Sequence, residues 1–243
     1  MKKVFAIIFI IILLPFLTGL FIYLNSPDFN QLVNHNPDYT AFMKMDMDKN
    51  IKIRHSFLPL SKIDRDLVQS IILAEDAAFW SHEGIDWYEV KESLVTDLKE
   101  GKLKRGASTI SQQLIKNLYF TPQKSFIRKF KEMIYVNKLE KILNKKRILE
   151  LYLNYIELGR GVYGVNTACN YYFDHGADSV SVFEAIRLAA VIPAPKRLTP
   201  NDSTSNSLYY RSKIILERLS RFNRIDSLEY QQSMVELQNF FNK

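Results

Sequence analysis

The feature that most constrains the fold of this chain is an uncharged, apolar run close to its N-terminus. Residues 4–24 contain no Asp, Glu, Lys or Arg, and a helix needs about 20 apolar residues to cross a bilayer. Pro15 and Gly19 interrupt the run, which membrane helices tolerate. The length and composition of the segment therefore predict a single transmembrane helix at residues 4–24.

The residues that flank this run predict its orientation. Lys2 and Lys3 precede it and Asp28 follows it, and positive charge marks the cytoplasmic side. A cleaved signal peptide is the alternative, but its apolar region is usually about 7–15 residues long and ends at a small-x-small site. No convincing site follows Leu24. We therefore expect residues 1–3 to form a cytoplasmic tip, and the body of the chain to lie outside the cytoplasmic membrane.

Charge and cysteine content limit the partners and the kinds of metal site that this body can have. The 243 residues include 33 Lys plus Arg and 26 Asp plus Glu, a net charge of +7, which suits a phosphate, an acidic lipid or a nucleic acid. An extracytoplasmic body makes nucleic acid a poor partner. Cys169 is the only cysteine, which rules out an internal disulfide and a cysteine-rich metal centre. The four histidines lack the spacing of a zinc site.

Hydrophobic spacing and capping sequences predict a mostly α-helical body. Capping boxes are expected for Ser61 with Asp64, Thr109 with Gln112, and Ser181 with Glu184. Apolar spacing predicts helical segments at 61–84, 88–100, 109–119, 125–153 with a bend near residue 144, 181–192 and 208–222, with a last helix after them. A basic, glycine-containing stretch covers residues 101–106, and residues 25–60 are expected to form a connector with short extended pieces. We find no internal repeat and no strong run of strands.

Glu75 is the first candidate for chemistry, because helical spacing puts it on the same face as Ile71, Ile72 and Phe79. Apolar surroundings desolvate a carboxylate, raise its pKa and make it a better base. A glutamate that reaches solvent or pairs with a neighbour is the commoner case. The spacing of Glu75 alone therefore does not establish an active site.

Two further segments carry polar and basic side chains in a helical pattern. In residues 105–117, a Gly-Ala-Ser turn leads into a helix N-terminus, where free amides favour an anion, and Lys116 adds a charge. A well-capped amphipathic surface helix is the simpler alternative. Arg128, Lys129 and Glu132 form a basic cluster with one carboxylate, which suits a phosphate leaving group. The alternative is a surface ion pair.

Aromatic and basic residues alternate in the segment between these two groups. Its apolar members are Phe120, Phe126, Ile127 and Phe130, and its basic members are Lys124, Arg128 and Lys129. This composition is typical of a segment that lies at a membrane surface. Core aromatics with a solvated basic side explain it equally well.

Five motifs then occur in the order of a known family. They are Glu75-Asp76-Ala-Ala-Phe79-Trp-Ser-His82-Glu-Gly84; Gly106-Ala-Ser108-Thr109-Ile-Ser-Gln112-Gln113-Leu-Ile-Lys116-Asn117; Arg128-Lys129-Phe-Lys-Glu132; Ile148-Leu149-Glu150-Leu-Tyr152-Leu153-Asn154 with Gly159 and Tyr163-Gly164; and residues 185–195. On these motifs the chain resembles glycosyltransferase family 51, in particular the monofunctional biosynthetic peptidoglycan transglycosylases. One motif would be weak, whereas five in order are specific.

This resemblance implies a fold and a reaction. The fold would be a lysozyme-like, two-lobed helical domain at residues 61–222, behind the single transmembrane helix, with residues 223–243 as a helical tail. The reaction would polymerise lipid II into β-1,4-linked glycan with inversion, and would release undecaprenyl diphosphate. The enzyme would be a single-pass protein of the bacterial cytoplasmic (inner) membrane, with its catalytic domain on the periplasmic side.

The resemblance also implies roles for individual residues. Glu75 would be the general base, and Glu132 the second catalytic carboxylate, which helps the diphosphate leave. The residues that would bind the diphosphate and the sugar are Lys116, Arg128, Lys129, Ser108, Gln112, Gln113 and Asn117. The residues that would support the first motif are Asp76, Phe79, His82 and Gly84.

Cofactors and partners follow from the same resemblance. No cofactor is required, and a divalent cation (Mg²⁺ or Mn²⁺) near Glu132 stays open, although no spacing demands one. The expected partners are lipid II, lipid-linked glycan, the membrane, and cell-wall synthesis or division proteins, with no nucleic acid.

Two other functions remain as alternatives. A lytic transglycosylase or lysozyme-like enzyme would share a catalytic glutamate, but it would not need cations around a diphosphate. A non-catalytic, membrane-anchored cell-wall scaffold would not need both Glu75 and Glu132. A bifunctional penicillin-binding protein is not expected, because neither Ser-x-x-Lys nor Lys-Thr-Gly occurs in the chain.

Overall fold

A computed structural model describes the backbone of residues 2–100, 108–123 and 125–243, and the side chains of these residues except 2–12, 94 and 97–100. The basic stretch at 101–106 and Lys124, both singled out in the sequence, lie outside the described residues. Helices dominate the described part, so the prediction of a mostly α-helical body is confirmed.

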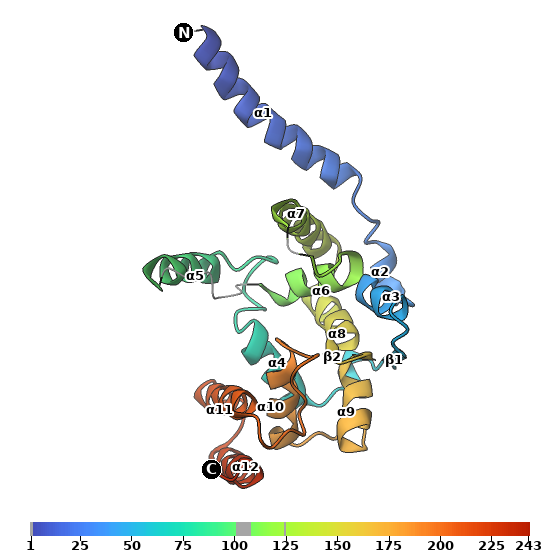
Figure 1. The fold of residues 1–243 in the computed structure, drawn as a ribbon, viewed down its shortest axis with the longest axis vertical. Coiled ribbons are helices and arrows are strands. Elements are labelled where there is room, and N and C mark those ends of the chain that lie inside the picture. Colours follow the sequence, from blue (N-terminus) through green and yellow to red (C-terminus); the bar gives the residue numbers. More distant parts are fainter. Residues whose placement is uncertain (1, 101–107, 124) are drawn as a thin grey trace.

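The N-terminal segment forms one helix, α1 (Lys2–Leu24), that projects from one end of the body (Figure 1). Its C-terminal part lies against α7 (Phe126–Ile142), where Gly19 faces Phe130 and Ile134. Among the residues whose side chains are described, no helix has both the length and the apolar character needed to cross a membrane. The transmembrane role of residues 4–24 stays a prediction.

Residues 25–60 are packed onto the body and hold several short elements. These are α2 (Gln31–Asn34), α3 (Ala41–Met47), β1 (Arg54–His55) and the start of a 3₁₀ turn, η1 (Leu60–Lys62). Phe29 and Met43 are fully buried in the core. Arg147 fixes the segment from the other side, because its guanidinium donates to the carbonyl oxygens of Leu32 and His35 at 2.8 and 3.0 Å.

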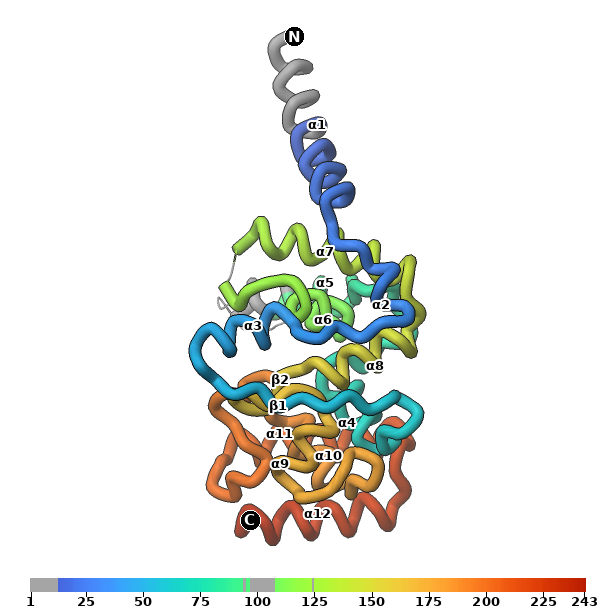
Figure 2. The backbone as a smooth tube through the Cα atoms, turned by 90° about the vertical axis from the view of Figure 1, so that its right-hand side faces the viewer, coloured from blue at the N-terminus to red at the C-terminus, as the bar shows by residue number. Residues whose placement is uncertain are grey.

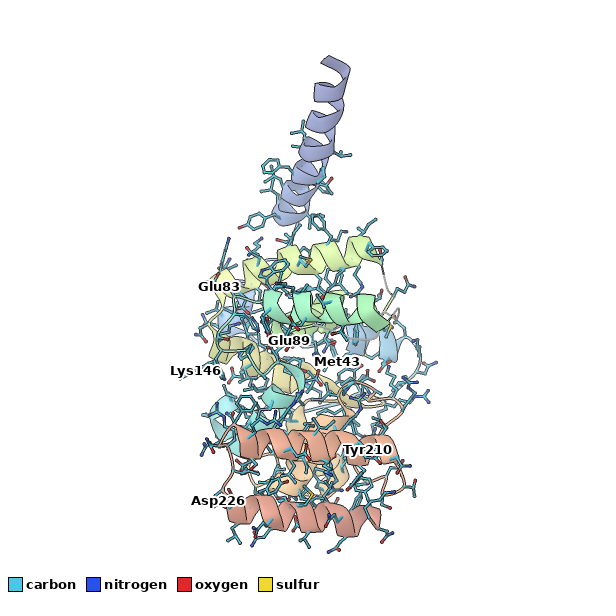
Figure 3. All side chains as sticks on the ribbon, turned by 90° about the vertical axis from the view of Figure 1, so that its left-hand side faces the viewer. Met43, Glu83, Glu89, Lys146, Tyr210 and Asp226 are labelled. Atoms are coloured by element: carbon cyan, nitrogen blue, oxygen red, sulfur yellow. The ribbon has the colours of Figure 1, made fainter. Side chains whose placement is uncertain are left out.

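Most of the remaining helices form two groups, and two helices run between these groups (Figure 1). Nearest to α1 lie α5 (Trp87–Glu100), α6 (Ile110–Tyr119) and α7. Farthest from it lie α10 (Val182–Val191), α11 (Asn206–Arg221) and α12 (Ser227–Phe241). Between them run α4 (Arg65–Glu75), which packs on α10 and α11, and α8 (Lys145–Tyr155), which packs on α6. Figure 3 shows α11 and α12 side by side, with Tyr210 on the first and Asp226 at the start of the second.

A small sheet ties the N-terminal segment to the middle of the chain. Its order is β1-β3-β2, where β2 (Glu157–Gly159) and β3 (Val162–Tyr163) are antiparallel and β1 is parallel to β3. Arg54 pairs with Val162 and His55 with Tyr163. The sheet lies between α8 and α9 (Val165–Phe173) in Figure 2. Its strands are only two or three residues long, too short to give an alternating sequence pattern.

The capping sequences predicted some helix starts correctly and others wrongly. The capping boxes at Thr109 and Ser181 are confirmed, but the one at Ser61 is wrong. Ser61 lies in η1, and Asp64 is the N-cap of α4, because its Oδ1 accepts from the amides of Asp66 and Leu67. The long helix expected at 125–153 is two helices, since Leu143 is extended and Asn144 caps α8 through the amide of Arg147 at 2.9 Å.

Candidate active site

Glu75 is the last residue of α4, at the point where the chain leaves the helix. Ile71 and Ile72 are buried beside it, as the spacing predicted. Phe79 is also fully buried, but it does not belong to the same helix, because α4 ends at Glu75 and Asp76 has φ −162°. The predicted helix to residue 84 is therefore wrong in its second half. The carboxylate lies at a helix end, partly accessible, over an apolar floor.

The carboxylate of Glu75 is held by an amide whose orientation is fixed. Gln113 Nε2 donates to Glu75 Oε2 at 2.7 Å, and the buried Tyr152 hydroxyl donates to Gln113 Oε1 at 3.1 Å. Because an ionised carboxylate only accepts hydrogen bonds, the NH₂ group must point to Glu75, which leaves the amide oxygen to accept from the Tyr152 hydroxyl. Burial raises the pKa of Glu75, while the hydrogen bond from Gln113 and the more distant Arg211 and Lys116 lower it. The net direction is upward, as expected of a desolvated base.

Asp76, directly after the base, joins the first two motifs. Its carboxylate accepts from His82 Nε2 at 2.9 and 3.0 Å and from the Ile110 amide at 3.0 Å. His82 Nδ1 accepts from the Gly84 amide at 3.1 Å, so the proton of a neutral imidazole is on Nε2. Ile110 is the first residue of α6. The anion that this helix N-terminus attracts is thus a side chain of the protein itself.

Gly84 and Thr109 make the second link between these motifs. Thr109 Oγ1 donates to the Gly84 carbonyl oxygen at 2.6 Å, and the Thr109 amide donates to Gln112 Oε1 at 3.0 Å. Gly84 has φ +89°, and a Cβ there would lie 2.5 Å from Val136 Cγ1. Only glycine fits both constraints. Gln112 is buried and its amide oxygen completes the capping box, so it supports the helix start.

Glu132 is the second carboxylate, and its surroundings differ from those of Glu75. It is buried, and each of its oxygens accepts from a cation: Arg128 Nη1 at 3.0 Å and Lys129 Nζ at 2.6 Å. Lys129 also donates to Ser108 Oγ at 3.2 Å. The buried Arg128 Nε has no hydrogen-bond partner in the described part of the chain. The predicted basic cluster therefore forms, with one donor still unused.

Lys116 lies within electrostatic range of both carboxylates. Burial and the nearby cations lower its pKa, while Glu132 and Glu75 raise it, and the net direction is downward. Its ammonium is 5.8 Å from the centre of the Phe42 ring. No hydrogen bond or ion pair joins this ammonium to another described residue. A desolvated cation without a partner is well suited to bind an anion.

The chain was then compared with known proteins. Residues 44–220 match the family described as "Transglycosylase". The chain belongs to this family. The transglycosylase match spans all five motifs, and it places Glu75, Lys116 and Glu132 inside the matched region.

Curated relatives of this transglycosylase match over most of its length. The biosynthetic peptidoglycan transglycosylase of Herminiimonas arsenicoxydans is 37% identical over 224 residues, which cover 90% of this chain and 95% of the relative. The protein of the same name from Chromobacterium violaceum is 39% identical over 77% of this chain and 84% of the relative. Among solved structures, penicillin-binding protein 1A of Haemophilus influenzae is 20% identical with a TM-score of 0.45, over 75% of this chain and 18% of that one.

The transglycosylase site therefore has three connected parts. A base unit contains Glu75, Gln113 and Tyr152, and a cationic unit contains Lys116, Arg128, Lys129, Glu132 and Ser108. A supporting unit contains Asp76, Phe79, His82, Gly84, Thr109 and Gln112. Gln113 links the first two units, since its Nε2 also lies 3.5 Å from the Ser108 carbonyl oxygen.

Sequence reasoning assigned no role to two residues of this transglycosylase site. Tyr152 appeared only as a member of the fourth motif, and its hydroxyl orients Gln113. Arg211 on α11 lies in electrostatic range of Glu75, and no motif pointed to it. In the described part of the chain, no group of three or more His, Cys, Asp or Glu side chains is arranged to hold a metal ion.

Proposed function

We propose that this peptidoglycan glycosyltransferase polymerises lipid II into β-1,4-linked glycan strands, with Glu75 as general base and undecaprenyl diphosphate as leaving group. The observation that carries the proposal is the contrast between its two carboxylates. Glu75 is desolvated and receives one neutral donor, whereas Glu132 is saturated by two cations. Two acids in such different environments can take different tasks in one reaction.

In the first half of the reaction, Glu75 takes a proton from the acceptor. The 4-hydroxyl of the acceptor sugar would approach the partly accessible carboxylate and lose its proton as its oxygen attacks the anomeric carbon of the donor. A raised pKa makes Glu75 a stronger base than an exposed carboxylate. Gln113 keeps one oxygen of Glu75 occupied, so the other faces the acceptor. Attack opposite the leaving group inverts the anomeric carbon without a covalent intermediate.

In the second half, the cationic unit stabilises the departing diphosphate. The bond from the anomeric carbon to the diphosphate oxygen breaks, and negative charge grows on that oxygen. Lys116, whose ammonium has no hydrogen-bond or ion-pair partner among the described residues, is available to receive it. Glu132 orients Arg128 and Lys129 for this task. Preorganised cations of this kind are commonly the largest contribution to such catalysis.

A lipid-linked substrate agrees with the apolar surface near α1. The exposed residues there include Trp87, Tyr88, Phe126 and Ile127, of which Phe126 is 98% exposed. They lie on α5 and α7, in the part of the molecule nearest to α1 (Figures 1 and 3). We propose that α1 is a single-pass anchor in the cytoplasmic membrane and that α5 and α7 contact its periplasmic surface. The helical body would then be the lysozyme-like, two-lobed domain of the family.

The experiment that tests the function is polymerisation of lipid II by the purified full-length protein. We expect wild-type protein to make glycan polymer and Glu75→Gln to lose about 10²–10⁴-fold of the rate, the contribution typical of a general base. Glu217→Gln, an exposed glutamate on α11, is the matched control and should polymerise like wild type. Full activity of Glu75→Gln would remove the base assignment.

The same assay separates the rival functions. Cleavage of preformed glycan without polymerisation of lipid II would assign the chain to the lytic class. Lack of both activities, in a protein with a normal thermal transition, would support a non-catalytic scaffold. Glu75→Gln is expected to keep or raise the melting temperature at pH 7, because the raised pKa means that the ionised carboxylate costs stability above that pKa and not below 4.5.

A further inference from the structure

A cavity of about 420 Å³ lies beside Glu75 and shares Gln113 and Lys116 with the proposed mechanism, which uses none of its other lining residues. Its volume is that of a small-molecule site. Gln113, Lys116 and Asn117 of α6 form the side nearest the base. The other walls come from α3, from the start of β2 and from the loop after α10, and include Phe42, Met45, Lys49, Pro122, Ile156, Glu157 and residues 192–197.

The charged groups that line this cavity are mostly cations. Lys49, Lys116, Lys196 and Arg197 face one lining carboxylate, that of Glu157. Among the described residues, no hydrogen bond or ion pair engages the side chains of Lys49, Lys116 and Arg197. The cavity is therefore positive and has unused donors.

One lysine bridges the two carboxylates nearest the cavity. Lys196 Nζ lies 2.9 Å from Asp46 Oδ1 and 3.1 Å from Glu157 Oε1. Asp46 is fully buried and also accepts from the Tyr163 hydroxyl at 2.8 Å. Because Lys196 offsets one of the two negative charges, the acids can cancel at most one of the three positive charges of Lys49, Lys116 and Arg197. An incoming anion would meet the side chains of Lys49 and Arg197.

We propose that this cavity binds a carboxylate on the peptide arm of the substrate, with Lys49 and Arg197 as its ligands. The proposal rests on the glycosyltransferase function above, because the cavity shares Gln113 and Lys116 with that site. The wall composition favours a peptide over a second phosphate. Phe42, Met45 and Ile156 give apolar surface for short side chains, and the Asn117 amide, buried at one wall, offers hydrogen bonds to a peptide group.

The first test measures binding without catalysis. A soluble N-acetylmuramyl peptide with free carboxylates, and the same peptide with its carboxylates amidated, are titrated calorimetrically into full-length protein in detergent. We expect wild type to bind the free form about tenfold more tightly, a difference of about 1.4 kcal/mol. The double variant Lys49→Gln/Arg197→Gln should lose this preference.

A matched double variant controls for net charge. Lys62→Gln/Arg221→Gln also removes one exposed lysine and one exposed arginine, so both proteins go from +7 to +5, and neither control residue lines the cavity. The control should keep the tenfold preference. Equal binding of the two peptides by wild type, or equal loss in both double variants, would overturn the pocket.

The second test uses lipid II and separates the pocket from the proposed function. With free-carboxylate lipid II, Lys49→Gln/Arg197→Gln should raise KM several-fold at nearly constant kcat, and with amidated lipid II it should not. A KM increase that is the same for both substrates would mean that the cations serve the diphosphate, which overturns the proposal. If wild type binds the free peptide selectively but does not polymerise lipid II, the proposed function is refuted and the carboxylate-binding pocket is still supported.

Discussion

Glu75 and Glu132 differ in the donors that their carboxylates receive, and the different roles proposed for them rest on this contrast. The donor that Glu75 receives is neutral and is oriented by a third residue, Tyr152. The donors that Glu132 receives are charged and are neighbours on its own helix. The base is therefore tuned from two other helices, α6 and α8, whereas the cationic unit is largely assembled within α7.

The pH dependence of the reaction should report this tuning. The pKa of Glu75 is raised by burial, and Gln113 opposes the increase by stabilising the ionised form. Gln113→Leu removes that donor, so the pKa rises further and less base is ionised at a given acidic pH. We expect the acid limb of the lipid II polymerisation profile to move to higher pH in this variant, by about 0.5–1 unit for one lost hydrogen bond.

A second glutamine variant makes this prediction specific. Gln232→Leu, at an exposed position on α12, should leave the profile where it is in wild type. An unchanged acid limb in Gln113→Leu, with only a lower plateau, would mean that Gln113 does not set the acidity of the base.

Single residues also mark the limit of what the sequence could predict. Spacing along a helix predicted the apolar floor of Glu75 at Ile71 and Ile72. It could not predict that Asp76, 34 positions before Ile110, would occupy the helix start proposed for a ligand anion. It also could not assign Tyr152, because its contact with Gln113 joins residues 39 positions apart. Pairings of this kind depend on how the helices pack, which local patterns do not encode.

The turn between α4 and α5 connects the first motif, residues 75–84, with the second, residues 106–117. Gly84 is the most crowded position of this turn. Gly84→Ala should destabilise the protein by about 2–4 kcal/mol, because the left-handed backbone disfavours alanine and the new Cβ would lie 2.5 Å from Val136 and 2.8 Å from Glu140. Denaturant unfolding of the full chain in detergent measures this loss. Activity should fall as well, since Thr109 donates to the Gly84 carbonyl oxygen.

Another glycine provides the comparison for this turn. Gly176→Ala places its Cβ 2.6 Å from Asp178 Oδ1, the end of a side chain that can rotate away. Its unfolding free energy should change by less than about 1 kcal/mol. A Gly84→Ala protein as stable as Gly176→Ala would show that the turn relaxes freely and does not hold the motifs.

Helix starts and helix ends differed in how well local chemistry predicted them. Thr109 and Ser181 start helices because each side chain bonds an amide three residues on, a contact within one turn. No glycine or proline marks the end of α4 at Glu75 in the sequence. The helix ends where the carboxylate of Asp76 accepts hydrogen bonds from His82 Nε2 and from the Ile110 amide, which are tertiary contacts. Local sequence thus predicted these two helix starts, whereas the end of α4 coincides with tertiary contacts that it does not encode.

On the scale of the whole molecule, one set of exposed apolar residues, Trp87, Tyr88, Phe126 and Ile127, lies on the helices nearest to α1. The chain has only two tryptophans, Trp80 and Trp87, and both are exposed. If α5 and the turn before it contact the bilayer, tryptophan fluorescence of the full-length protein should be quenched by lipids brominated on their acyl chains. A water-soluble quencher should lose efficiency when the protein is moved from detergent into vesicles.

One substitution assigns the signal to α5. Trp80→Phe leaves Trp87 as the only tryptophan, and we expect most of the lipid quenching to remain, because Trp87 is the more exposed of the two. If brominated lipid does not quench this variant while the aqueous quencher does, then α5 lies in water and α1 alone holds the enzyme at the membrane.

The bond between Asp76 and the Ile110 amide has a consequence for how the enzyme can change over time. In many phosphate-binding proteins the backbone amides of a helix start hold the anion, and among substitutions only one to proline removes an amide N–H. Here that position is taken by Asp76. In the mechanism proposed above, recognition of the diphosphate depends on the side chains of Lys116, Arg128 and Lys129, each of which a single codon change can replace. Affinity for the lipid-linked donor can therefore drift in small steps, without any change to the backbone that positions the base.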